Sequence, residues 1–149
     1  MLEPRRLQIS SRSTFSAEAL ASRSAMGVRT VSFKHFQVNP QAFLNSIDAM
    51  LKAHACTRYD RVDTSQASAE MRKTFARWHY HTDRELRLCL AALETDPPMF
   101  HFEGISVTVG PGDLLVIPAH CPHAFEGSGE FLRLFSEDTD WTPFFLSED

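Results

Sequence analysis

The apolar residues of this chain change their spacing near residue 79, and this change limits the folds that are available to it. Beyond that point apolar side chains alternate with polar or small ones, for example at Leu86, Leu88 and Leu90. A period of two is typical of strands with one buried face. The predicted strands include residues 86–90, 105–109, 114–117 and 131–135. Glycine, proline and aspartate separate these runs, so we predict an antiparallel meander of short strands, suited to a small barrel or sandwich.

The residues before position 79 follow the helical period instead. Helices are predicted over residues 16–26, from Asn39 onward and over residues 66–77, with a short strand after the first helix. Asn39 followed by Pro40 is typical of a helix start, because the asparagine side chain caps the first turn and proline fits its first position. The first half of the chain is therefore expected to be mainly helical.

The composition is that of one ordinary globular domain. The chain has 149 residues, of which 43% are hydrophobic and 23% charged, enough for one core. We predict a flexible polar tail at 1–14 and one domain over 15–149 with an N-terminal helical layer. No apolar run reaches the roughly 20 residues that a membrane-spanning helix needs. We expect no membrane partner and a monomer.

The charges divide unevenly along the chain. Residues 1–87 carry 14 Lys or Arg against 8 Asp or Glu, whereas residues 88–149 carry only Arg133 against 11 acids. Phosphate binding requires clustered basic residues, which the second half lacks. We therefore expect no nucleic-acid partner.

The cysteines point to a reducing compartment. Cys56, Cys89 and Cys121 form no CxxC pair, and any disulfide would leave one of them over. The first dozen residues are rich in Arg and Ser, as in transit peptides, but they contain Glu3 and no apolar stretch, which excludes a secretory signal. We expect a cytoplasmic protein.

Two histidines, a carboxylate and an arginine stand close together at the start of the strand-rich half. If residues 79–87 are extended, His79, His81, Glu85 and Arg87 share one face, and the leucines at 86, 88 and 90 share the other. Polar groups that face a barrel interior lose several kcal/mol of solvation when they are unpaired. A divalent cation held by the imidazoles and the carboxylate would remove that cost.

A fourth ligand is predicted about forty residues downstream. His123 follows a turn, a strand and a proline-bounded bend. Three neutral imidazoles and one carboxylate suit iron, nickel, manganese or zinc better than calcium or magnesium. An octahedral ion would keep two positions open for a substrate. The alternative is that His79 and His81 are surface or core residues without a metal, as we expect for His35, His54, His101 and His120.

Longer motifs resemble a known family. Residues 79–85 read HxHxxxE and residues 112–123 read GDxxxxPxxxPH, which together resemble the metal signature of cupins. The stretches 85–87, 117–125 and 132–141 resemble acireductone dioxygenases in particular, and the similarity covers roughly residues 15–145. The resemblance implies a mainly β, single-domain cupin, a small barrel or jelly roll with helices in the N-terminal half.

The resemblance also implies a function. Acireductone dioxygenases belong to methionine salvage and use O2 to cleave a methylthio-substituted acireductone, an enediol ketone. With Fe²⁺ the family yields formate and 4-methylthio-2-oxobutanoate, and with Ni²⁺ a different cleavage that also releases carbon monoxide. One Fe²⁺ or Ni²⁺ per chain is implied, and the sequence does not decide between them.

Site roles follow from the same resemblance. His79, His81, Glu85 and His123 are implied as metal ligands, and Arg87 as the cation that stabilises the enolate. The residues implied to line the pocket are Phe75, Phe125 and Trp141, and Arg133 is a further candidate for substrate binding because it stands between Phe131 and Phe135. Arg133 could pair with Glu85 or the substrate, or form a salt bridge with another acid.

Two departures from the family pattern leave other functions open. Arg84 stands where the family usually has an acid before the ligand glutamate, so proton transfer would depend on Asp83 or be impaired. Ala92 replaces a glycine. The alternatives are a cupin dioxygenase for another enediol, diketone or aromatic substrate, and a noncatalytic cupin that binds a metal or small ligand.

Overall fold

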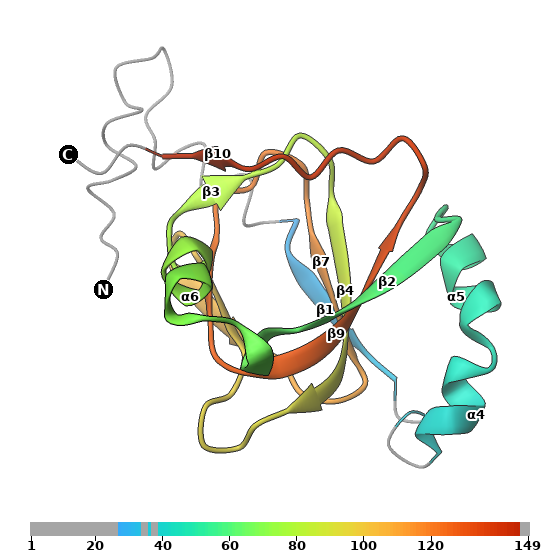
Figure 1. The fold of residues 1–149 in the computed structure, drawn as a ribbon. Helices are drawn as coiled ribbons and strands as arrows, with labels where there is room; N and C mark the ends of the chain where they lie inside the picture. The colour runs from blue at the N-terminus through green and yellow to red at the C-terminus, as the bar shows by residue number, and fades with distance from the viewer. Residues whose placement is uncertain (1–26, 34–35, 37–38, 147–149) are drawn as a thin grey trace.

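The computed structural model describes residues 27–33, 36 and 39–146 (Figure 1). The predicted tail at 1–14 and the predicted helix at 16–26 lie outside these residues. The helices are α4 (Pro40–Leu44), α5 (Ile47–Ala53), the 3-10 turn η2 (Thr64–Gln66) and α6 (Ala69–Phe75). The strands are β1 (Arg29–Ser32), β2 (Arg58–Asp63), β3 (His79–Tyr80), β4 (Glu85–Ala92), β5 (Met99–Phe102), β6 (Ile105–Thr108), β7 (Asp113–Ile117), β8 (Ala124–Glu126), β9 (Gly129–Phe135) and β10 (Phe144–Phe145). The described chain is thus mainly β, with its helices in the N-terminal half, as predicted.

The largest sheet has the strand order β1-β7-β4-β9-β2, and every neighbouring pair is antiparallel. Two smaller sheets accompany it in the described part of the chain, β6-β5-β8 and β10-β3. Figure 1 shows α4 and α5 together beside β2 and α6 on the opposite side of the molecule. The strands between them surround an interior that carries the predicted site.

The two faces of the large sheet bury different residues. One face packs on α4 and α5 and is aliphatic, with Leu86, Leu88 and Leu134 in one cluster with Ile47 and Met50. The interior face belongs to a second cluster that is richer in aromatic side chains. Its buried members are Cys89, Phe100, Phe102, Val109, Leu115, Ile117, Cys121, Phe125 and Phe131. The alternation of the sequence therefore separates an outer, helix-covered layer from the interior.

The helix at Asn39 begins as predicted but is interrupted, and the third predicted helix begins later than expected. Asn39 accepts a hydrogen bond from the Ala42 amide over 3.1 Å and Pro40 is the first helical residue. The expected helix is divided into α4 and α5 by a break at 45–46, where Ser46 becomes a new N-cap without a side-chain hydrogen bond. The third helix starts later than residue 66, because Ser68 caps it by accepting from the Met71 amide over 3.1 Å. None of the helices in the described part of the chain has the length and apolarity to span a bilayer.

The interpretation of residues 79–87 as one continuous extended segment was wrong. The chain leaves β3 after Tyr80, bends at 82–83 and enters β4 only at Glu85. Thr82 and Asp83 are turn-forming residues, and the bend lets β3 join β10 while β4 joins the large sheet. The parity inside β4 itself is as predicted, since Leu86 and Leu88 face the helices and Glu85 and Arg87 are hydrogen-bonded to each other on the other face.

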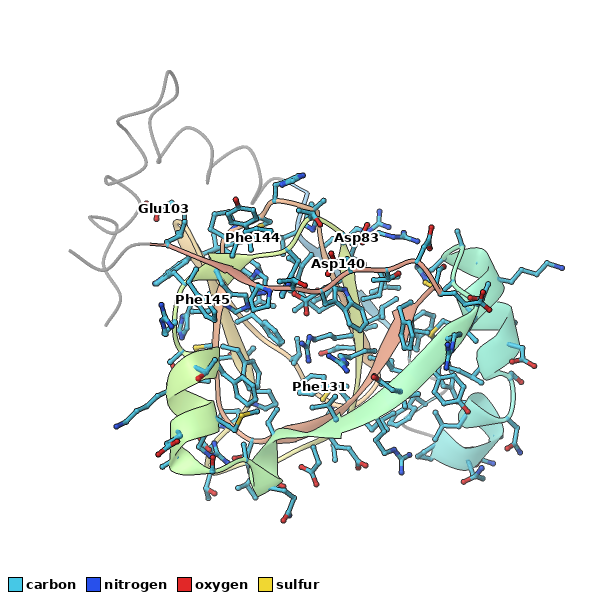
Figure 2. All side chains as sticks on the ribbon, turned by 45° about the horizontal axis from the view of Figure 1, so that its top comes forward. Asp83, Glu103, Phe131, Asp140, Phe144 and Phe145 are labelled. Carbon is cyan, nitrogen blue, oxygen red and sulfur yellow. The ribbon has the colours of Figure 1, made fainter. Side chains whose placement is uncertain are left out.

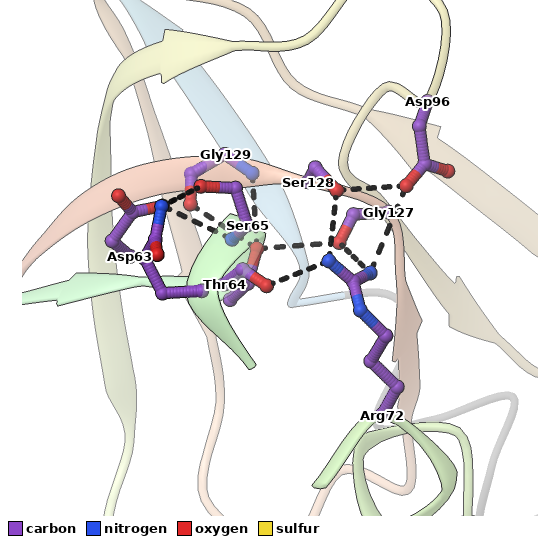
Figure 3. A network of polar contacts seen from close by, with 9 residues as sticks. Asp63, Thr64, Ser65, Arg72, Asp96, Gly127, Ser128 and Gly129 are labelled. Carbon is purple, nitrogen blue, oxygen red and sulfur yellow. Dashed lines mark hydrogen bonds and ion pairs between the residues drawn. The ribbon is translucent and has the colours of Figure 1, made fainter. Parts of the chain in front are cut away.

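A polar network connects α6 with the η2 turn and with the loop that precedes β9 (Figure 3). Arg72 donates to the carbonyl of Thr64 over 2.9 Å and to Ser128 Oγ over 3.1 Å. The buried Thr64 hydroxyl accepts from the Gly129 amide over 2.9 Å and lies 3.2 Å from the Gly127 carbonyl. Gly127 has φ +106°, and a Cβ there would lie 2.1 Å from the Pro97 carbonyl oxygen. Only glycine fits this turn.

Candidate metal centre

The four predicted ligands converge although they come from separate elements. His79 lies on β3, His81 in the bend after it, Glu85 at the start of β4 and His123 just before β8. His79 and His123 exchange backbone hydrogen bonds of 3.0 Å and 2.8 Å in an isolated antiparallel bridge. The His120 amide donates to the His81 carbonyl over 2.8 Å, which brings the bend at 117–123 against the bend at 81–84.

The three imidazoles offer nitrogen atoms that all lie within 4.8 Å of one another. Glu85 Oε1 lies 3.0 Å from His81 Nε2 and 2.9 Å from His123 Nε2. The rings of His79 and His123 are 4.5 Å apart between centroids. His81, Glu85 and His123 are 8%, 3% and 2% exposed, and His79 is half-buried. The site is therefore a compact cluster that solvent reaches mainly at His79.

Backbone carbonyls fix the orientation of two of the imidazoles. Nδ1 of His79 lies 2.8 Å from the Arg77 carbonyl, and Nδ1 of His123 lies 2.8 Å from the Cys121 carbonyl. A carbonyl oxygen can only accept, so Nδ1 carries the proton in both rings. When the rings are neutral, Nε2 therefore keeps its lone pair, as in metal-binding histidines, and Nε2 of His123 faces Glu85 Oε1.

Burial and neighbouring charges shift the pKa values of three groups in the cluster, and the shifts at His79 and Glu85 favour the forms that bind a cation. Burial, followed by the charge of His123, lowers the pKa of His79 to about 4, so this imidazole is neutral at pH 7. Burial by itself would raise the pKa of Glu85, but the Arg87 guanidinium and the His123 imidazole outweigh it and hold that pKa well below its usual range. Burial opposes protonation of His81, yet its contact with the ionised Glu85 raises the His81 pKa.

These residues fit a divalent transition metal. The buried Glu85 Oε1 has no hydrogen bond of acceptable geometry, although it touches two imidazoles. Two ligand atoms bound at right angles about 2.1 Å from one ion are about 3 Å apart. Glu85 Oε1 lies at this distance from Nε2 of His81 and from Nε2 of His123. Three imidazoles and one carboxylate are also a donor set suited to iron, nickel or zinc. The cluster is therefore a candidate metal centre with His79, His81, Glu85 and His123 as its ligands.

Arg87 lies directly beside this cluster. Its Nε donates to Glu85 Oε2 over 2.8 Å, and its guanidinium lies 5.9 Å from the centre of the Phe100 ring. The contact with Glu85 uses one N–H group, and the guanidinium fork carries further donors. Arg87 can therefore orient the ligand carboxylate and still present positive charge to an anionic substrate.

Arg133 lies opposite Arg87 in the sheet but forms an ion pair with a different acid, Asp60. The two arginines are paired across β4 and β9, and Asp60 on β2 is paired with Arg133 on its other side. Arg133 donates from Nε to Asp60 Oδ1 over 2.9 Å and from the terminal nitrogen to Oδ2 over 2.6 Å. Of the partners considered from the sequence, the salt bridge is the one formed, and nothing in the sequence had indicated Asp60. A contact of Arg133 with substrate stays a prediction.

The predicted aromatic residues lie at two different places. Phe75 and Phe125 pack edge to face 6.1 Å apart and line a surface cleft near α6, together with Arg72 and Asp96. Trp141 lies below the Arg133 guanidinium at 4.6 Å and donates from Nε1 to the Arg84 carbonyl over 3.3 Å. Their contact with a substrate remains a prediction.

Asp83 and Arg84 both contact elements outside the metal cluster. The Asp83 carboxylate accepts from the Asp140 amide over 2.7 Å, and Figure 2 shows the two residues side by side above the interior. Arg84 is exposed and its guanidinium donates to the carbonyl of His54 at the end of α5. The arginine that departs from the family pattern therefore contacts the end of α5, and its guanidinium is not directed to the metal cluster. The role of Asp83 as a proton acceptor stays a prediction.

Comparisons with known proteins indicate one family. The family model described as "ARD/ARD' family" matches residues 6–143. Acireductone dioxygenase 1 of Coprinopsis cinerea is 26% identical over 136 residues, 82% of this chain and 75% of that protein. Acireductone dioxygenase 3 of Physcomitrium patens is 33% identical over 84 residues, which cover 52% of this chain and 40% of that protein.

A solved structure supports the fold. The acireductone dioxygenase from Bacillus anthracis, described with a cadmium ion in its active centre, has a TM-score of 0.64 at 20% identity and covers 85% of this chain and 89% of its own. The cupin fold expected from the motifs is thus confirmed. Because the family model matches nearly the whole chain, this protein belongs to the ARD/ARD' family, the enzyme family of the acireductone dioxygenases.

Proposed function

We propose that this protein is a metal-dependent dioxygenase that cleaves an acireductone with O2, in methionine salvage. The observation that carries the proposal is the convergence of three imidazoles, two of which contact the carboxylate that Arg87 orients. The curated relatives are named acireductone dioxygenases, and their sequence identity with this chain is modest, at 26% and 33%. The substrate, its products and the native metal are therefore proposals for this chain.

The charges of the interior support an anionic substrate. Glu85 and Arg87 form one ion pair, and Asp60 and Arg133 form a second one. The two pairs cancel, so a bound divalent cation adds two positive charges to a largely apolar interior. A dianionic enediolate balances them, because electrostatic attraction is strong where the dielectric is low. A neutral substrate would leave that charge uncompensated.

The bound metal would supply Lewis-acid chemistry and a template for two neighbouring oxygen atoms. His79, His81, Glu85 and His123 would hold it. Arg87 would bind the enolate oxygen and stabilise its negative charge. Asp83 would accept the proton that the enediol loses, and Phe75, Phe125 and Trp141 would line the pocket from two sides. We propose Fe²⁺ or Ni²⁺, one per chain, with formate and 4-methylthio-2-oxobutanoate as the products of the iron form, in a cytoplasmic monomer.

The test is single-turnover chemistry on protein of defined metal content. An acireductone is added anaerobically to the Fe²⁺-loaded protein, oxygen is admitted, and substrate absorbance and formate are measured. We expect substrate loss and one formate per substrate. No consumption and no formate would refute the proposal. Oxygen uptake with other enediols or diketones, but not with an acireductone, would favour the other cupin dioxygenases, and no uptake with any metal would favour a noncatalytic cupin.

A further inference from the structure

The strand that carries His79 does not belong to the large sheet. β3 is two residues long, and its partner in a sheet is β10, with Phe145 opposite His79 and Phe144 opposite Tyr80. The Leu146 amide adds a hydrogen bond of 3.0 Å to the Trp78 carbonyl. The chain near its C-terminal end therefore holds the backbone of a predicted metal ligand (Figure 1).

The Phe145 side chain also contacts the imidazole of that ligand. Its ring lies 5.7 Å from the His79 ring, and the guanidinium of Arg77 lies 4.0 Å from the centre of the Phe145 ring. The carbonyl of the same Arg77 accepts from His79 Nδ1 over 2.8 Å. The outer side of the His79 imidazole is thus bounded by Phe145, and Arg77 fixes both rings.

His79 needs such support more than the other ligands do. His81 and His123 are buried and touch Glu85 directly, whereas His79 is half-buried. A half-buried side chain keeps rotamer freedom, and that freedom is lost when it binds an ion. Partners that hold a ligand in its binding orientation reduce this loss, and removing them commonly weakens metal affinity about 10–100-fold.

We propose that Phe145, held by Arg77, is a positioning residue that keeps His79 in its metal-binding orientation. The proposal rests on the metal site of the proposed function and adds a residue that contacts neither metal nor substrate. It predicts that metal affinity depends on a side chain of β10, more than sixty residues away from His79 in the sequence.

The neighbouring residue offers a matched control. Phe144 lies on the same strand and stacks on Tyr80 at 5.4 Å, and Figure 2 shows Phe144 and Phe145 on opposite sides of β10. The two rings are similarly exposed, at 44% and 36%. Phe144→Ala and Phe145→Ala therefore remove equal apolar groups from one strand, and only Phe145→Ala removes the contact with a ligand.

The experiment measures metal binding without turnover. Metal-free full-length protein is titrated with Co²⁺ in competition with a chromogenic chelator, and the visible Co²⁺ bands report the coordination. We expect Phe145→Ala to weaken Co²⁺ binding at least about tenfold and to alter these bands. Phe144→Ala should stay within about twofold of the parent, and Phe145→Leu, which keeps bulk but no ring, should fall between them. Equal affinities for Phe145→Ala and the parent, or equal losses in the two alanine variants, would overturn the proposal.

A second variant covers the case in which Phe145→Ala unfolds. Arg77→Gln keeps the carbonyl that accepts from His79 and removes the cation that holds Phe145, and its fold is checked by the thermal unfolding of the metal-free protein. We expect a weaker loss of Co²⁺ affinity with the same change in the bands. A folded Arg77→Gln protein with parental affinity and spectrum would overturn the proposal. If the parent itself binds no Co²⁺, it is the metal site of the proposed function that fails.

Discussion

Arg87 donates from Nε to Oε2 of Glu85 over 2.8 Å, while the other oxygen of the same carboxylate faces two imidazoles. One side chain thus orients a predicted metal ligand and brings a fixed positive charge beside it. We expect Arg87→Gln to retain about one metal ion per chain but to lower kcat/KM by about 100-fold or more, because the charge that stabilises the enolate is lost. Metal analysis and steady-state kinetics check this.

A matched substitution at the same position separates charge from geometry. Arg87→Lys keeps the charge and loses the planar fork that can bind two oxygens at once. We expect intermediate activity. Full activity of Arg87→Gln would show that the guanidinium does not take part.

Loss of a buried ligand should abolish tight metal binding. His81→Ala and His123→Ala each remove one of four predicted donors, together with its contact to the buried Glu85 carboxylate. The control is His101→Ala, since His101 contacts Ser106 and Glu126 on another sheet. Metal content by mass spectrometry should fall far below one per chain in the first two variants and stay parental in the control. Stoichiometric metal in both ligand variants would refute the assignment.

The layer between the large sheet and its helices should dominate stability. Leu88 is 0% exposed in the aliphatic cluster under α5. We expect Leu88→Ala to lower the free energy of unfolding of the metal-free protein by about 2–5 kcal/mol, through lost burial and a cavity. Urea denaturation measures this. Leu93→Ala, at a position 50% exposed, should change it by less than about 0.5 kcal/mol, and similar losses in both variants would contradict the packing.

The buried Thr64 hydroxyl should contribute measurably to the free energy of unfolding. It accepts from the Gly129 amide and lies within hydrogen-bond distance of two carbonyls, all of them buried. Thr64→Val keeps the shape and leaves these groups without a partner, so we expect a loss of about 1–3 kcal/mol in urea denaturation. Ser65→Ala, one residue further in an exposed position, is the control and should be nearly neutral. A neutral Thr64→Val would show that the network does not stabilise α6.

The cysteines should be unreactive in the folded protein. Burial raises the pKa of both Cys89 and Cys121 to about 12, and the thiolate is the nucleophilic form. Ellman's reagent at pH 8 should therefore label these two thiols only slowly, and all three cysteines of the chain should react once guanidinium unfolds it. Rapid labelling of two or more thiols in the native protein would contradict their burial.

The sequence allowed the prediction of strands that carry a run or an alternation of apolar residues. β4 and β6 show the alternation, whereas β7 and β9 are apolar runs because both of their faces are buried. β2 escaped prediction because it is an edge strand whose residues are mostly charged and exposed. β10 has two residues, too few for any period, and its pairing with β3 depends on the bend at 82–83.

The candidate site was predictable for a related reason. Metal ligands must be particular residue types at restricted spacings, so His79, His81, Glu85 and His123 left a readable pattern. Residues that only form a salt bridge with a site residue leave no such pattern in the sequence. Asp60 lies 73 positions from Arg133, and nothing distinguishes it from other aspartates on edge strands. The hydrogen bond between Arg84 and the end of α5 could not be predicted from the sequence either.

The predicted ligands lie on or beside all three sheets of the described chain: His79 comes from β3, Glu85 from β4 and His123 from the residue before β8. An ion bound by all of them would add cross-links to the backbone bridge between His79 and His123. By mass action it would add to the free energy of unfolding as its concentration rises above the Kd. Supply of the ion would then govern how long a newly made chain resists proteolysis, as well as whether it can catalyse.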